Sequence, residues 1–177
     1  MEIEVLRIGQ RLVRDDRVTT HVALVARAFG ASKIYMNEIN PEITKTIKKV
    51  NYTWGGRFQL HLIDDWKKLI KMKQSKGYKI IHLTMYGLDI GTMPNILSNE
   101  EMILVVVGAE KVPRLAYTLA DYNVSIGSQP HSEISALAVF LDRIQNGVQF
   151  EKKFGNGKRR IIPTNEGKRV VITQKRD

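Results

Sequence analysis

The sequence predicts an α/β fold with a mainly parallel sheet and helices on both faces of that sheet. Two observations carry this prediction. Short apolar runs typical of strands alternate along residues 1–150 with longer segments whose apolar residues recur at helical spacing. One run, from Met102 to Val107, is almost wholly apolar, which is typical of a strand in the buried middle of a parallel sheet. A regular alternation of strands and helices favours the α/β class.

Each predicted strand is a short apolar or alternating run bounded by turn residues. Gly9 ends the first strand, and Gly108 follows the fifth. The segment between the fourth and fifth strands contains Gly87, Gly91 and Pro94, so we expect an irregular loop there. The predicted strands span residues 3–8, 33–37, 58–63, 78–83, 102–107 and 123–126.

The predicted helices begin at residues that suit a helix start. Asp15 or Asp16 can cap the first helix, which Gly30 ends. Asp64 is expected to cap the helix that Gly77 closes. The remaining helices are expected to begin at Asn40–Pro41, Pro113 and Ser132.

The end of the chain departs from this rhythm and carries most of the net charge. The 177 residues hold 28 Lys and Arg against 18 Asp and Glu, a balance of +10. Residues 151–177 hold nine basic and three acidic side chains and so contribute +6. Two β-rich runs, 160–163 and 169–173, flank a turn sequence and predict a hairpin. We expect an α/β domain over 1–150 and a basic appendage over 151–177, which is either a nucleic-acid contact or a solvated tail.

Composition and motifs exclude several kinds of site. The chain has no cysteine, and its four histidines lack the spacing of a metal site, so we expect no metal ion. It lacks GxGxxG after the first strand, GxxxxGK[ST] and GxSxG, which argues against dinucleotide-binding, P-loop and α/β-hydrolase sites. The apolar runs are too short for a membrane span, and the first residues lack the features of a signal peptide. The expected location is the cytoplasm.

Ligands of open α/β sheets bind beside the carboxyl ends of the strands. Three predicted strands end at Leu83, Val107 and Ile126, and the last two lead into loops 108–113 and 127–133, each of which starts with glycine. Glycine lets the backbone approach a flat ligand, and the free N–H groups of a helix start can hold its polar atoms. Either loop alone also fits an ordinary turn and cap. Together they predict a cofactor pocket.

Three segments carry a resemblance to a known family. They read RLVRDDRVTTHVAL over residues 11–24, VVGAEKVP over 106–113 and IGSQPHSEISALA over 126–138. The chain resembles archaeal tRNA ribose 2′-O-methyltransferases of the SPOUT superfamily, the type that modifies cytidine 56 in the TΨC loop. The resemblance implies a C-terminal trefoil knot, a homodimer, tRNA as substrate and S-adenosylmethionine bound in the knot.

The resemblance also assigns residues to the site. An arginine of the first motif is expected to help activate the ribose hydroxyl, and both Arg14 and Arg17 match it. His21 lies one helical turn beyond Arg17 and either faces the same site or is a partly buried helix histidine. The implied cofactor residues are Leu83, Gly108, Ala109, Glu110, Lys111, Val112, Ile126, Gly127, Ser128, Gln129, Pro130, His131, Ser132 and Glu133.

Some of these assignments have structural alternatives. Ser132 can contact a ligand or cap a helix, and Glu110 and Glu133 can hold the methionine ammonium or simply favour a helix N-terminus. Two rival functions also stay open. The same fold can act on another RNA nucleotide, or the chain can be a non-catalytic RNA-binding module.

Overall fold

The computed structural model describes residues 1–9, 15–37, 40–109 and 111–173. Its centre is a six-stranded sheet with the strand order β3-β2-β1-β5-β4-β6, and all neighbouring strands in it run parallel. These strands are β1 (Glu2–Ile8), β2 (Lys33–Met36), β3 (Gln59–Leu62), β4 (Lys79–Asp89), β5 (Met102–Gly108) and β6 (Tyr122–Ser125). The predicted α/β class with a mainly parallel sheet is confirmed.

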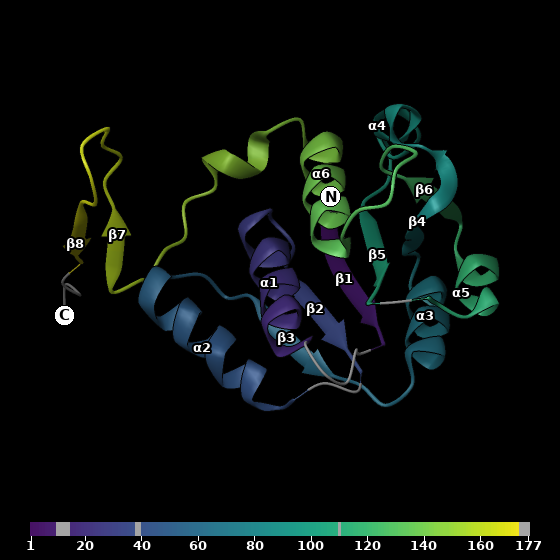
Figure 1. The fold of residues 1–177 in the computed structure, drawn as a ribbon, viewed down its shortest axis with the longest axis horizontal. Helices are drawn as coiled ribbons and strands as arrows, with labels where there is room; N and C mark the ends of the chain where they lie inside the picture. The colour runs from purple at the N-terminus through teal and green to yellow at the C-terminus, as the bar shows by residue number, and fades with distance from the viewer. Residues whose placement is uncertain (10–14, 38–39, 110, 174–177) are drawn as a thin grey trace.

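Helices cover both faces of the sheet, as predicted. One face packs against α1 (Asp15–Ala28), α2 (Glu42–Trp54), α4 (Met93–Ile96) and α6 (Glu133–Gln145). Figure 1 shows α1 and α6 crossing in front of the strands, and these two helices contact each other. The opposite face packs against α3 (Trp66–Ser75) and α5 (Arg114–Leu119). Because β1 is central, its side chains serve both cores: Ile3 and Val5 face the first, whereas Leu6 and Ile8 face the second.

Two local predictions are wrong. Asp65 caps α3 in place of Asp64, because its carboxylate accepts hydrogen bonds from the backbone N–H groups of Lys67 at 2.8 Å and Lys68 at 3.1 Å. The fourth strand does not end at residue 83. β4 continues to residue 89, and the segment predicted to be an irregular loop then forms a 3₁₀ turn (Ile90–Thr92) and α4.

Gly87 explains how β4 can continue past β6. The pairing register of the two strands shifts between Leu83 and Leu88. A side chain at Gly87 would meet the backbone of Asn123 and Val124 in β6, so the two segments pass each other in direct backbone contact. Gly87 therefore allows the close approach of β4 and β6. It does not mark a turn, although the residues around it are typical of a loop.

The end of the chain leaves the sheet and forms a separate element. After α6, a 3₁₀ turn (Val148–Glu151) leads into β7 (Arg159–Ile161) and β8 (Val170–Ile172), which pair antiparallel as a two-stranded sheet of their own. Figure 1 shows this pair beyond one end of α2, away from the six-stranded sheet.

Candidate active site

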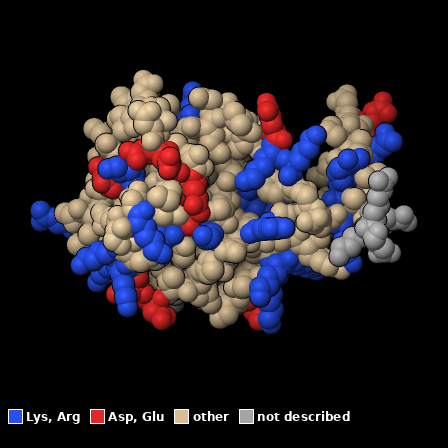
Figure 2. Space-filling view, turned by 180° about the vertical axis from the view of Figure 1, so that it is seen from behind, with Lys and Arg blue, Asp and Glu red and all other residues tan. Residues whose placement is uncertain are grey.

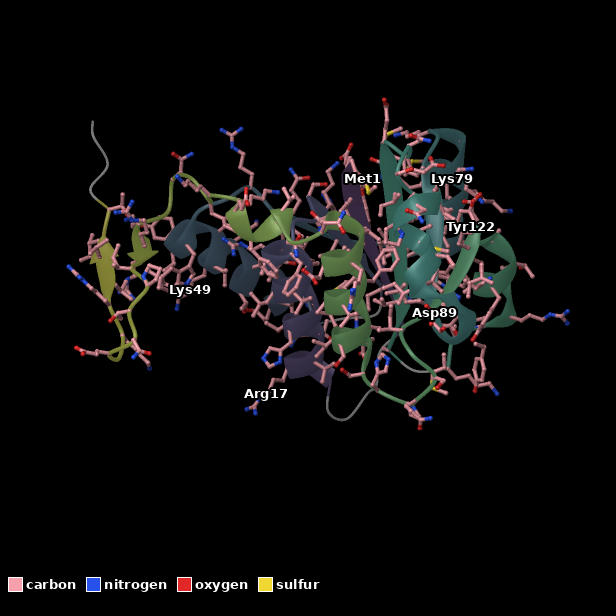
Figure 3. All side chains as sticks on the ribbon, turned by 90° about the horizontal axis from the view of Figure 1, so that it is seen from above. Met1, Arg17, Lys49, Lys79, Asp89 and Tyr122 are labelled. Carbon is pink, nitrogen blue, oxygen red and sulfur yellow. The ribbon has the colours of Figure 1, made fainter. Side chains whose placement is uncertain are left out.

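A cavity of about 700 Å³ opens beside three neighbouring strands, β5, β4 and β6. Its walls come from residues at and after the carboxyl ends of β5 and β6 and from residues 82–86 within β4. In Figure 3, Met1 and Lys79 mark the edge of the sheet where β1 and β4 start, and Asp89 and Arg17 lie toward the opposite edge, where the strands end. The volume falls within the range of cofactor sites, roughly 300–1,000 Å³.

Most of the predicted cofactor residues line this cavity. They are Leu83, Gly108, Ala109, Lys111, Val112, Ile126, His131, Ser132 and Glu133. Four others belong to the exposed loop beside the cavity and are not part of its described lining: Gly127, Ser128, Gln129 and Pro130. Glu110 lies outside the described residues. The structure therefore brings together Leu83, Gly108 and Ile126, which the sequence singled out, although Leu83 lies within β4 and not at its end.

Other lining residues were not predicted. They are His82, Thr84, Met85, Tyr86, Val107, Arg114, Tyr117 and Ala136. One signal was available, because a histidine inside the apolar run of β4 needs a polar partner once it is buried. Arg114 and Tyr117 come from α5, which directly follows the predicted loop. Tyr86 lies on the part of β4 that was expected to be irregular, so no strand pattern indicated it.

A chain of hydrogen bonds stiffens the buried side of the cavity. His82 is 1% exposed, and its Nδ1 lies 2.8 Å from the Asn123 Oδ1. Asn123 donates from Nδ2 to the Tyr117 carbonyl at 3.0 Å, which fixes its Oδ1 as the atom that faces His82. His82 therefore donates from Nδ1, and its Nε2 is the acceptor of the neutral ring. The Tyr117 hydroxyl continues the chain to Thr84 Oγ1 at 3.0 Å.

Burial decides the charge of this histidine. Removal from water lowers the pKa of His82 and outweighs its hydrogen bond to Asn123, which acts in the opposite direction. The His82 ring also meets the Tyr117 ring edge to face, with 4.6 Å between the centroids. The cavity is thus bordered by a neutral, fixed imidazole.

The loop that enters α6 is closed by its own side chains. His131 donates from Nε2 to the Ile126 carbonyl at 2.7 Å, which draws the two ends of the loop together. Ser132 is the N-cap of α6, and its Oγ accepts from the Ser135 N–H at 3.2 Å. Ser132 therefore has the structural role that was one of its two interpretations, and it also lines the cavity.

A buried ion pair ties this loop to β1. Arg7 is fully buried, and its Nη2 lies 3.5 Å from Glu133 Oε1. The same guanidinium donates from Nη1 to the Gly9 carbonyl at 3.1 Å, while the Gly9 N–H donates to Asn37 Oδ1 at 3.2 Å. Glu133 thus lines the cavity, lies in the first turn of α6 and pairs with a cation beneath the site.

The predicted catalytic residues lie apart from the cavity wall. Arg17 and His21 are exposed on α1, one turn apart, and neither belongs to the described lining of the cavity. Exposure rules out the partly buried alternative for His21. Arg14 lies outside the described residues.

The residues that the structure describes contain neither a metal-binding cluster nor a membrane-spanning helix. Within them, no three His, Asp or Glu side chains gather as a metal site would require. None of the helices in the described ranges is long and apolar enough to cross a membrane.

Comparison with known proteins supplies the family. The family model described as tRNA ribose 2′-O-methyltransferase, aTrm56, matches residues 54–171. The chain belongs to the aTrm56 family. A tRNA (cytidine(56)-2′-O)-methyltransferase from Nitrosopumilus maritimus is 63% identical over 177 residues and is covered over its full length, as is this chain. The aTrm56 relative from Methanocaldococcus jannaschii is 48% identical over 180 residues, with 100% of this chain and 99% of the relative covered.

Solved structures share the fold of this aTrm56 protein. A TrmH/SpoU tRNA-modifying enzyme from A. aeolicus superimposes with a TM-score of 0.63 at 14% identity, covering 85% of this chain and 79% of that one. The SpoU methyltransferase AviRb from Streptomyces viridochromogenes, solved in complex with AdoMet, gives 0.61 at 14% identity over 83% of this chain and 58% of the other. At such identities the likeness concerns the fold, which is that of SpoU/TrmH methyltransferases.

Proposed function

We propose that the protein transfers a methyl group from S-adenosylmethionine to the 2′-hydroxyl of cytidine 56 in the TΨC loop of tRNA. Membership of the aTrm56 family carries this proposal, together with 63% identity over the full length to a relative named for that reaction. Because the substrate is tRNA, we place the protein in the cytoplasm.

The cavity at the strand ends fits S-adenosylmethionine. Leu83, Val112 and Ile126 offer apolar walls for the adenine ring, and Glu133 offers a carboxylate for the amino-acid end. The loop residues 127–130 and Glu110 complete the proposed set of cofactor residues. When bound, S-adenosylmethionine supplies an electrophilic methyl group on its sulfonium. No metal ion is needed for that chemistry, and we propose none.

The chain's own residues must align the ribose, exclude water and help a proton to leave. An arginine is a poor proton acceptor because its guanidinium stays protonated throughout the physiological pH range. We assign Arg14 or Arg17 to orienting the ribose hydroxyl and the adjacent phosphate, which lowers the pKa of that hydroxyl. A guanidinium suits this role because its planar fork binds phosphate through two hydrogen bonds. His21, one turn from Arg17, is the neighbour proposed to share the proton.

We further propose a trefoil knot and a homodimer. The close passage of Gly87 beside β6 and the continuation of β4 past its register shift support a chain that threads around its last strands. Exposed apolar side chains at the cavity and next to it support a second copy as partner: Met85 is 42%, Tyr86 81% and Leu88 56% exposed. Multi-angle light scattering tests the dimer, and a monomer at micromolar concentration would contradict it.

The test of the function is direct. Unmodified tRNA transcript is incubated with the protein and methyl-labelled S-adenosylmethionine, and the modified nucleotide is mapped by mass spectrometry. We expect one methyl group, on the ribose of cytidine 56. A methyl group on a base or at another nucleotide supports the rival enzyme. Calorimetry without saturable uptake of S-adenosylmethionine supports the non-catalytic module.

A further inference from the structure

The segment that leads to β7 is attached to α2 by a seam of glycines. Gly56 donates from its backbone N–H to the Gly155 carbonyl at 3.0 Å. A Cβ at Gly157 would lie 2.6 Å from the backbone N of Gly55, and a Cβ at Gly55 would lie 2.9 Å from the N of Gly157. Two backbones can approach this closely only without side chains. The end of the chain is therefore docked on the end of α2 and is not a loose tail.

A buried arginine contacts both sides of this glycine seam. Arg27 of α1 is 8% exposed. It donates from Nη2 to the Gly55 carbonyl at 2.5 Å and from Nε to Asn51 Oδ1 at 3.0 Å. Its guanidinium also stacks over the Phe154 ring, 4.5 Å from the centroid. One side chain thus joins α1, α2 and the docked segment, which fixes where the β7–β8 pair begins.

Basic side chains gather on the surface that this docking creates. We define the α2–hairpin surface by five exposed residues: Lys48, Lys49, Lys158, Arg159 and Arg160. None of them forms an ion pair with a carboxylate that the structure describes. Figure 2 shows Lys and Arg side chains crowded over the end of the molecule that carries the hairpin, with few acidic ones among them.

The docking also joins the two halves of this surface. Lys158 donates its backbone N–H to the Tyr52 carbonyl at 3.3 Å, and its Nζ lies 4.3 Å from the centroid of the Tyr52 ring. Tyr52 is at the end of α2, beyond Lys48 and Lys49, whereas Arg159 and Arg160 begin β7. The helix lysines and the strand arginines are therefore held in a fixed relation to each other.

We propose that the α2–hairpin surface binds the phosphate backbone of the tRNA body, away from the nucleotide that is methylated. This inference rests on the proposed function, which makes tRNA the partner. A cavity of about 700 Å³ holds the cofactor and leaves most of a tRNA without contacts. Phosphate contacts from Lys and Arg supply most of the affinity and position the RNA, and the planar fork of arginine suits phosphate.

Two charge-matched variants test the proposal. The first is Lys48→Gln/Lys49→Gln/Arg159→Gln/Arg160→Gln. The control is Lys67→Gln/Lys68→Gln/Lys71→Gln/Lys76→Gln, which removes the same charge from exposed positions on and beside α3, at the other end of the sheet. The affinity for whole tRNA is measured at several salt concentrations. Because each phosphate contact adds about 0.9 to the magnitude of the slope of log K against log salt, four lost contacts should lower that magnitude by about 3.6.

The first variant should bind tRNA about tenfold more weakly or worse, and the control should stay within about twofold of the wild type. Equal losses in both would overturn the proposal, since net charge alone would then explain them. A third variant, Gly157→Val, keeps every charge but forces the seam apart. It should weaken tRNA binding at least about threefold, with S-adenosylmethionine affinity unchanged. Unchanged tRNA affinity in this variant would refute the role of the docking.

The two proposals fail in different ways. A wild-type protein that binds tRNA through this surface but leaves cytidine 56 unmethylated would contradict the proposed function alone. A protein that methylates cytidine 56, with equal tRNA affinity in the first variant and the control, would contradict the surface alone.

Discussion

A buried ion pair lies between the sheet and α3. Its burial and its partners determine how much unfolding free energy the protein should lose when the pair is broken. Glu4 of β1 is fully buried and pairs with Lys73, which is 5% exposed. Lys33 lies 3.0 Å from the same carboxylate, and the Tyr78 hydroxyl donates to it at 3.2 Å. Burial raises the pKa of Glu4, but the hydrogen bonds and charges of Lys73 and Lys33 together hold it below the usual value.

Removing one partner of this pair should lower the unfolding free energy strongly, whereas replacing both partners by apolar residues should lower it less. Glu4→Leu leaves the Lys73 ammonium buried against the faces of Tyr35 and Tyr78, at 5.1 and 4.3 Å, without a carboxylate partner among the described residues. Lys73→Met leaves the carboxylate with Lys33, which is partly solvated. Each single variant should lose about 3 kcal/mol of unfolding free energy, the lower end of the range for a broken buried pair.

The double variant Glu4→Leu/Lys73→Met puts two apolar side chains in contact and should lose no more than either single one. Urea unfolding at pH 7 measures all four proteins of the cycle. The melting temperature of each single variant should fall by about 6–12 °C for a chain of this size. A double variant that loses about 6 kcal/mol, the sum of the single losses, would refute the reasoning.

Three further predictions follow from other parts of the molecule. Because burial lowers the pKa of His82, the folded protein keeps it neutral while the unfolded chain gains a proton below about pH 6.5, so stability should fall on acidification. The unfolding free energy of His82→Gln, measured with urea, should fall less between pH 7 and pH 5 than that of the wild type. The same pH dependence in both proteins would contradict this. Gly87→Val should lose about 3 kcal/mol of unfolding free energy because the β6 backbone blocks the new side chain. In the control Gly91→Ala, the new side chain meets the flexible Asp89 side chain, so the loss should be smaller. Equal losses by thermal unfolding would argue against the close passage of β4 beside β6. Of Arg14→Ala and Arg17→Ala, one should lower the rate of methyl transfer by about 100-fold or more with cofactor affinity nearly unchanged in calorimetry, and full activity in both would exclude the arginine role.

Local signals predicted most of the sheet. The apolar run of β5 reflects burial between two layers of helices, which is a property that the sequence records residue by residue. The end of β4 was mispredicted because Gly87 serves a contact with β6, and such a contact joins segments far apart in the chain. The same limit explains the docked seam, since nothing near Gly157 indicates that Gly55 is its partner.

The candidate site was predictable from three segments of the sheet. Gly108 and Ile126 were found because parallel strands place their carboxyl ends at one edge. Leu83 also lines the cavity, but it lies within β4 and not at the predicted strand end. His82 and Tyr117 were missed because their roles depend on Asn123, which a neighbouring strand places between them. The ion pair from β1 to the start of α6 likewise needs the strand order, which the sequence pattern alone does not specify.

The measurement that tests the central claim most directly compares two tRNA substrates that differ by one oxygen atom. One carries an ordinary cytidine at position 56, and the other carries 2′-deoxycytidine there, so that only the attacking oxygen is removed. With labelled S-adenosylmethionine and mass spectrometry, the protein should place one methyl group on the ribose of the first tRNA and none on the second. Methylation of the deoxy substrate, or of a base in either tRNA, would contradict the proposed reaction.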